Sequence, residues 1–198
     1  MKKIILLCVV LPLFALFAIL FYQKENLNAA IATLLTTHNS NFDTIEAIQL
    51  QKESPTVTRY RHTLTLQLKN GHSLSLINRI RPRSRSHQKF NFVLYLKSIR
   101  FFLIHHDFQK TSGWLLIHDT TGQITNLPDL PQFSQDNQRF LTQKNGLKIF
   151  HIKKGKVTQE WATTIPVQNA QWLSPTKVTY TSISEPKKQI NLRLGRVY

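Results

Sequence analysis

Residues 63–77 read TLTLQLKNGHSLSLI, and this stretch decides the fold class. Leucines alternate with polar residues on both sides of Asn70-Gly71, and the first alternating run extends over residues 56–68. Period-two alternation places polar and apolar side chains on opposite faces of a strand. An Asn-Gly pair between two such runs favours a tight turn between antiparallel strands. We therefore predict a β-hairpin here.

Short strands and turns continue along the rest of the chain. Residues 90–108 are densely apolar and predict two strands with a break near Lys97-Ser98. The turn Asp119–Gly122 joins strands expected at 114–117 and 124–127. Further strands are expected at 147–152, 157–161, 178–182 and 190–194, and no long helix after residue 55. The pattern predicts a mainly β protein of antiparallel meander sheets, arranged as an incomplete propeller-like stack or a sandwich.

The N-terminus carries an uncharged apolar run from residue 4 to residue 22, preceded by Lys2-Lys3. This length just suffices to cross a bilayer, and the lysine pair orients the start of the chain toward the cytoplasm. Small residues suited to signal cleavage occur only at Ala30-Ile31-Ala32, far beyond the apolar run. We therefore expect a retained anchor in a bacterial inner membrane, with secretion to the periplasm after cleavage as the alternative.

These features divide the chain into three parts. Residues 1–22 are expected to form one transmembrane helix that serves as a signal anchor, and residues 23–55 a polar linker that is partly helical. Residues 56–198 would then form the β domain, on the periplasmic side of the membrane. The single cysteine, Cys8, excludes an intramolecular disulfide, so the domain must be held together by its core.

The charge balance is strongly basic. Lys and Arg total 26 against 10 Asp and Glu, which gives a formal net charge of +16. Such an excess favours contact with polyanions such as nucleic acid, anionic lipid headgroups or an acidic protein face.

The best candidate for an anion-binding surface is an arginine strip. Arg79, Arg81, Arg83 and Arg85 alternate with other residues, and Lys89 follows. Residues two apart share one face of an extended chain, so four guanidinium groups could line one edge and bind phosphate or carboxylate. The alternative is a solvated loop that only aids solubility. Additional basic groups occur at Lys153, Lys154 and Lys156 in a hairpin turn, and at Lys187, Lys188, Arg193 and Arg196 near the C-terminus.

Histidines and carboxylates offer a weaker signal. His105-His106-Asp107 and His118-Asp119 could converge on a metal ion if their strands pair, although adjacent histidines in a strand point to opposite faces. The sequence contains no nucleophile elbow, zinc helix or Gly-rich phosphate loop. We therefore predict no enzyme activity, no catalytic or metal-binding residues and no cofactor.

The C-terminal half contains an internal echo. Residues 114–122 lead to Phe133-Ser134-Gln135-Asp136-Asn137, and residues 147–155 lead to Trp172-Leu173-Ser174-Pro175-Thr176. These segments resemble the WD40-like repeats of TolB-type propellers, in which an aromatic residue precedes a Ser-Pro-Asp-Gly turn. Residues 64–180 also resemble a group of uncharacterised bacterial envelope proteins. The resemblance implies a stack of β-sheets and no particular reaction.

The function expected from these observations is a membrane-anchored, periplasmic binding protein without enzyme activity. Its partner would be an envelope protein or an anionic envelope component, contacted through the arginine strip. One alternative is nucleic-acid binding at the membrane, which would lose affinity steeply with salt. Another is a hydrolase with an unrecognised site, which would place a residue such as His106 or Asp119 in a pocket with a shifted pKa.

Overall fold

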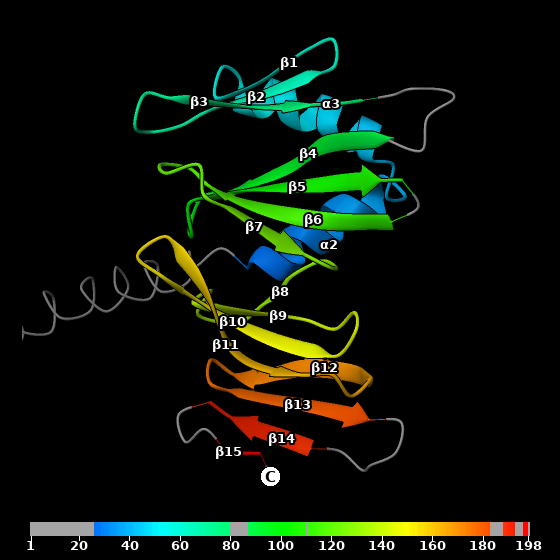
Figure 1. Cartoon of the computed structure of the whole chain (residues 1–198), viewed down its shortest axis with the longest axis vertical. Helices are drawn as coiled ribbons and strands as arrows, with labels where there is room; N and C mark the ends of the chain where they lie inside the picture. Colours follow the sequence, from blue (N-terminus) through cyan, green and yellow to red (C-terminus); the bar gives the residue numbers. More distant parts are fainter. Residues whose placement is uncertain (1–25, 80–86, 110, 183–187, 193–195, 198) are drawn as a thin grey trace, which may run out of the picture.

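The structure is a computed structural model that describes residues 26–79, 87–109, 111–182, 188–192 and 196–197. Within these ranges the protein is mainly β, with two helices and four small antiparallel sheets (Figure 1). Consecutive strands are neighbours in every sheet, as expected for meanders. The described sheets form an open stack and do not close into a propeller.

Each sheet is a continuous segment of the chain. The first sheet holds β1 (Val57–Tyr60), β2 (Thr63–Gln67) and β3 (Ser73–Ile77). The second holds β4 (Gln88–Leu96), β5 (Phe101–Phe108), β6 (Thr111–His118) and β7 (Ile124–Leu127). The third holds β8 (Gln132–Phe133), β9 (Arg139–Thr142), β10 (Leu147–Lys153) and β11 (Lys156–Thr163). The fourth holds β12 (Val167–Ser174), β13 (Lys177–Ser182), β14 (Lys188–Asn191) and β15 (Arg196–Val197).

The hairpin predicted around Asn70-Gly71 is confirmed, because β2 and β3 pair in antiparallel register across it. The preceding run differs from the prediction of one strand over residues 56–68. The chain reverses at Arg61-His62, and β1 pairs with β2. Arg61 adopts a left-handed backbone conformation with φ 52°. Such a turn without glycine or asparagine leaves no signal in the sequence pattern.

Helices α2 (Leu27–Thr37) and α3 (Phe42–Glu53) lie within the segment expected to be a partly helical polar linker. Each begins at an asparagine whose side chain accepts backbone N–H groups of the first turn, Asn26 for α2 and Asn41 for α3. Both helices bury apolar side chains against the sheets. This segment is therefore part of the packed domain.

The helices also form hydrogen bonds with two edge strands. These are β4 and β8, the first strands of the second and third sheets. The buried carboxylate of Glu46 in α3 accepts the backbone N–H of Phe92 in β4 at 3.1 Å. It also accepts a hydrogen bond from Arg59 Nη2 at 2.6 Å. The side-chain amide of Asn28 in α2 pairs with both backbone groups of Phe133 in β8, each at 2.7 Å. Side chains thus replace the missing neighbour strand at these two edges.

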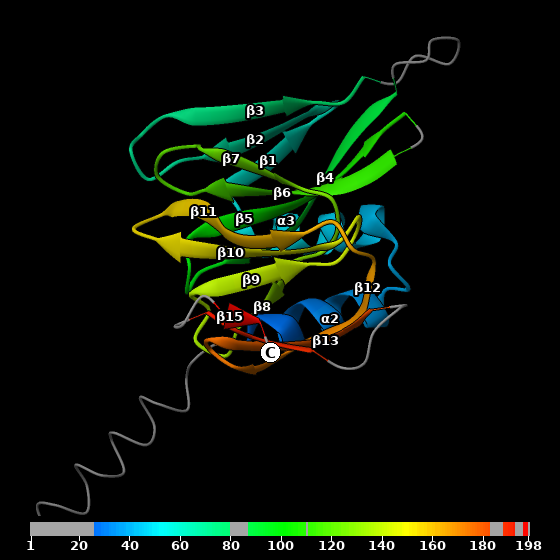
Figure 2. The same ribbon diagram turned by 60° about the horizontal axis from the view of Figure 1, so that its bottom comes forward.

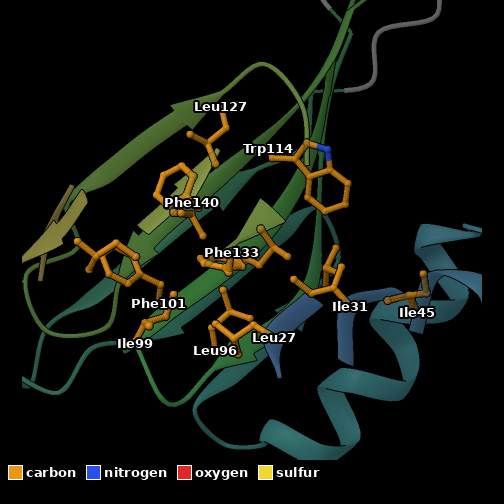
Figure 3. Close-up of a cluster of buried hydrophobic side chains, with 14 residues drawn as sticks. Leu27, Ile31, Ile45, Leu96, Ile99, Phe101, Trp114, Leu127, Phe133 and Phe140 are labelled. Atoms are coloured by element: carbon orange, nitrogen blue, oxygen red, sulfur yellow. The ribbon is translucent and has the colours of Figure 1, made fainter. Parts of the chain in front are cut away.

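Among the described residues, three apolar clusters hold the stack together. The central cluster lies between the second and third sheets and includes Leu27 and Ile31 of α2 and Ile45 of α3 (Figure 3). Its sheet residues include Phe101 of β5 and Phe140 of β9, both almost completely buried. The second cluster joins the first two sheets, and the third joins the last two. Alternate residues of β5 point into different clusters, as the pleat of a strand requires.

The two segments of the internal echo occupy matching places. Residues 114–122 cover most of β6 and its turn, and residues 147–155 cover β10 and its turn. Both strands are third in their sheets, and the aromatic residues Phe133 and Trp172 lie in the first strands of the sheets that follow.

The expected membrane anchor, residues 1–22, lies outside the described residues. Among the residues that the structure describes, no helix is both long enough and apolar enough to cross a membrane.

Candidate binding surface at the turns

Turns from three sheets come together at one end of the stack. They are the β2–β3 turn after Lys69, the β4–β5 turn at residues 97–100, the β6–β7 turn at residues 119–123 and the β10–β11 turn at residues 154–155. Figures 1 and 2 show all four on the same side of the molecule. We call their exposed basic residues the turn surface: Lys69, Lys97, Arg100, Lys153, Lys154 and Lys156.

A buried carboxylate, that of Asp119, joins the first two sheets at this end. The side chain is 1% exposed and is surrounded by four donors. They are Lys69 Nζ at 2.7 Å, Arg100 Nε at 3.2 Å, the Tyr95 hydroxyl at 2.7 Å and the Thr120 hydroxyl at 2.8 Å. Burial by itself would raise the pKa of Asp119, but the hydrogen bonds of these donors lower it to about 2. The carboxylate therefore stays charged and fixes the turns to each other.

Backbone hydrogen bonds support the same junction. Lys69 N–H donates to the carbonyl of Asp119 at 2.7 Å, and Asp119 N–H donates to the carbonyl of Arg100 at 2.9 Å. Two of the turn-surface cations, Lys69 and Arg100, are thus committed to a structural carboxylate. Their outer parts remain accessible, with about half of each side chain exposed (54% and 49%).

The β10–β11 turn packs on the second sheet through a glycine. Gly155 has φ +74°, and a Cβ atom at this position would collide with the imidazole ring of His118. His118 in turn shares a hydrogen bond between its Nδ1 and the Thr121 hydroxyl at 3.1 Å. The lysines on either side of Gly155 are therefore held at a defined place on the turn surface.

The described carboxylates are all engaged inside the protein. Eight of the ten acidic residues fall within the described ranges, and each contacts a cation, a histidine, a hydroxyl or a backbone N–H. They are Asp43, Glu46, Glu53, Asp107, Asp119, Asp129, Asp136 and Glu160. In this part of the chain Lys153, Lys154 and Lys156 form no ion pair. The positive charge at the hairpin is therefore not neutralised by any of the eight described carboxylates.

Arg79 and Lys89 are the residues of the predicted arginine strip that the structure describes, and both lie near the start of β4, at the other end of this strand from the β4–β5 turn. Arg79 is exposed and forms an isolated bridge with Gln88, at the start of β4. Arg81, Arg83 and Arg85 lie outside the described residues. Lys89 is half-buried and paired with Asp43 of α3 at 2.7 Å, so this cation helps to fasten α3 to the sheet.

The histidines of β5 do not converge. His105 stacks on Phe42 with ring centroids 3.7 Å apart, whereas His106 faces the ring of Phe90 on the other side of the sheet. Burial lowers the pKa of both imidazoles. Within the described ranges, no three His, Cys, Asp or Glu side chains are placed to hold a metal ion. Asp119 is enclosed by its donors, which leaves its carboxylate no access to a substrate.

A polar cavity of about 420 Å³ lies near the end of the stack that carries the turn surface. Residues of α2 and its N-cap, of β8 and the turn after it, and of β12 line it. They are Asn26, Asn28, Gln132, Phe133, Ser134, Gln135, Asn137, Gln171 and Trp172. None of these side chains is ionisable, which contrasts with the strongly basic chain around them.

Sequence reasoning missed most of this arrangement. The lysines around Gly155 stand out in the sequence, but Lys69 and Arg100 join them only through the packing of the sheets. The cavity residues are spread from residue 26 to residue 172 and share no spacing.

Comparison with known proteins adds no assignment. No family model matches the chain, and no curated protein matches it. The turn surface and the polar cavity are therefore the basis for inferring a function.

Proposed function

We propose that the protein is a non-enzymatic interaction module that binds an anionic partner through the turn surface. The observation that carries this proposal is the gathering of basic side chains from three sheets at one end of the stack. The described carboxylates are engaged elsewhere, so the lysines of the β10–β11 hairpin have no competing partner among the residues that the structure describes.

Electrostatics favours such a role. A group of exposed cations raises the local concentration of an anionic partner and speeds its association. The rigid junction around Asp119 supports the proposal, because cations held on packed turns lose less conformational freedom on binding than cations on a mobile loop.

In this proposal residues 1–22 anchor the chain in the bacterial inner membrane and the β domain lies in the periplasm. The apolar run after Lys2-Lys3 supports this placement. The partner is then an envelope protein or an anionic envelope component. The arginine strip, from Arg79 to Arg85 with Lys89, is a second candidate contact for the same partner.

The resemblance to TolB-type propellers belongs to the same proposal. Three consecutive four-stranded meanders, with the internal echo at matching strands, support an incomplete propeller-like stack. In such a stack α3 packs along β4, the first strand of the second sheet, and α2 along β8, the first strand of the third. Function is not carried over with the architecture.

The proposal is tested with the full-length chain, purified in detergent and used as bait for envelope extract treated with nuclease. The turn variant replaces Lys153, Lys154 and Lys156 by glutamine. The matched strip variant replaces Arg79, Arg81 and Arg83 by glutamine, so that both lose three positive charges. We expect a defined partner to be retained by wild type and by the strip variant and lost from the turn variant.

Other outcomes would contradict the proposal. Loss from the strip variant alone would move the interface to the arginine strip. Equal retention by all three baits would show that neither basic group binds. Recovery that disappears on nuclease treatment, with affinity falling steeply as salt rises, would favour nucleic-acid binding instead.

A further inference from the structure

We propose that the polar cavity binds one sugar ring of an acidic glycan whose acid groups lie on Lys153 and Lys154. This inference rests on the proposed function and names the chemical class of its anionic partner.

The lining suits a neutral polyhydroxylated ring. Amide side chains dominate it, and each amide offers both donors and acceptors, as do the hydroxyl groups of a sugar. A site for a phosphate or carboxylate alone would be expected to have a cation in its lining, and a site for an apolar ligand would have an apolar lining. The volume of about 420 Å³ lies within the range of roughly 300–1,000 Å³ that is usual for small-molecule sites.

Some lining groups hold the cavity in shape. Asn28 is committed to the backbone of Phe133 through both atoms of its amide. The indole N–H of Trp172 donates to the carbonyl of Gln132 at 2.9 Å. The indole ring is half-buried and fixed by this bond, so it offers a preformed apolar surface for the C–H face of a sugar.

Other lining groups are free to bind. The side chains of Gln135 and Gln171 are exposed, and neither makes a hydrogen bond with any residue that the structure describes. They come from two different elements, the turn after β8 and the strand β12. A ring on Trp172 could therefore exchange hydrogen bonds with amides of both elements.

The cavity adjoins the basic hairpin. The backbone N–H of Ile152 donates to the carbonyl of Gln138 at 2.8 Å, which ties the end of β10 to the turn that lines the cavity. Lys153 and Lys154 follow Ile152 directly and are exposed. A chain of sugars that leaves the cavity toward the hairpin would thus meet two cations without an ion-pair partner among the described residues. This continuity favours an acidic glycan over a neutral one.

A glycan array tests the inference with the full-length chain in a detergent whose headgroup is not a sugar, since a maltoside would compete. The array carries acidic glycans, their neutral esterified or desulfated counterparts, and the sugar-free polyanions polyglutamate and polyphosphate. The cavity variant replaces Gln135 and Gln171 by alanine. The control variant replaces Gln159 and Gln168, exposed glutamines outside the cavity, by alanine.

We expect at least one acidic glycan to bind more tightly than its neutral counterpart and than both sugar-free polyanions. The cavity variant should weaken this binding by about tenfold, from the loss of two hydrogen bonds, and reduce it to the level of the polyanions. The control variant should bind every glycan as wild type does. The turn variant should bind the acidic glycan no more tightly than its neutral counterpart, and its affinity for the neutral counterpart should equal that of wild type.

The outcomes separate this inference from the proposed function. Binding that follows charge alone and is unchanged in the cavity variant overturns the glycan site but leaves the basic turn surface standing. Binding of neutral glycans with no preference for acid overturns the proposed function and leaves a cavity for sugar. No binding to any glycan overturns the inference.

Discussion

Five of the six cations of the turn surface form two groups that differ in what they contact, and the sixth, Lys97, pairs with Glu53 of α3 at 3.6 Å. Lys69 and Arg100 share the buried carboxylate of Asp119, and their charge is balanced within the protein. Lys153, Lys154 and Lys156 lie on the neighbouring hairpin, exposed and without an ion pair in the described part of the chain. The same residue type thus serves the fold in one place and is available to a partner in the other. The two groups differ because Lys69 and Arg100 contact the buried carboxylate of Asp119, whereas the hairpin lysines contact no described carboxylate.

The largest effect is expected for Asp119→Asn. An amide cannot replace a carboxylate that accepts from a lysine, an arginine and a tyrosine, so the junction between the first two sheets weakens. We expect the free energy of unfolding to fall by about 2–4 kcal/mol. Urea unfolding followed by tryptophan fluorescence measures it.

Asp107→Asn is the matched control, because the side chain of Asp107 is 40% exposed and its one ion pair with a described residue, to the His105 ring, is long at 3.8 Å. The control should cost less than about 1 kcal/mol. Equal destabilisation by the two variants would mean that the Asp119 junction is no more structural than a surface contact.

Gly155 lets the hairpin that carries Lys153, Lys154 and Lys156 pack against His118. Gly155→Ala combines a left-handed backbone, φ +74°, with a collision against His118. We expect a loss of about 2–3 kcal/mol in the free energy of unfolding. Gly71→Ala is the control, because Gly71 also has positive φ but faces open space. It should lose only about 1 kcal/mol, so similar losses would argue against packing of the hairpin on His118.

Much of the fold could be predicted from the sequence, because many of its strands and turns are determined by residues that are neighbours in the sequence. The strands with strong alternation and the turns at Gly71, Gly122 and Gly155 need only neighbouring residues to be recognised. β8 and β9 are too short to show a period. The turn at Arg61-His62 lacks the usual residues for a hairpin. These elements form because the surrounding sheets and α2 bury them, a tertiary effect that no short window contains.

The candidate site was less predictable, because it depends on distant contacts. The lysines around Gly155 are evident in the sequence, but nothing local indicates that Lys69 and Arg100 share a carboxylate with the next sheet. Likewise, Asn28 and Trp172 line one cavity only because α2 packs along β8 and because the Trp172 indole bonds to Gln132. Neither contact has a signature in composition or spacing.

Two titratable groups, His105 and Asp119, make the stability of the fold depend on pH in different ranges. Burial lowers the pKa of His105, which is stacked on Phe42 and in edge contact with Trp114. The unfolded state therefore binds the proton more readily, and stability falls as the pH drops below about 6.5, the ordinary value for histidine. Asp119 acts in a lower window, since its pKa of about 2 contributes stability that is lost between about pH 4 and pH 2.

Thermal unfolding over this pH range separates the two groups. His105→Phe should flatten the loss that begins below about pH 6.5, because an uncharged ring keeps the stacking without taking up a proton. It should leave the step below about pH 4 in place. A His105→Phe variant with an unchanged profile in the upper window would assign that loss to His106 and His118, whose pKa values burial also lowers.

The smallest effect on stability is expected for the free lysines themselves. Replacing Lys153, Lys154 and Lys156 by glutamine removes no ion pair seen in the described residues, and it relieves repulsion between like charges. The free energy of unfolding should stay within about 0.5 kcal/mol of wild type. Because the same variant is expected to lose the anionic partner, unfolding and binding measured on one preparation separate the two roles. A variant destabilised as strongly as Asp119→Asn would show that these lysines serve the fold, and the distinction between the two groups of cations would disappear.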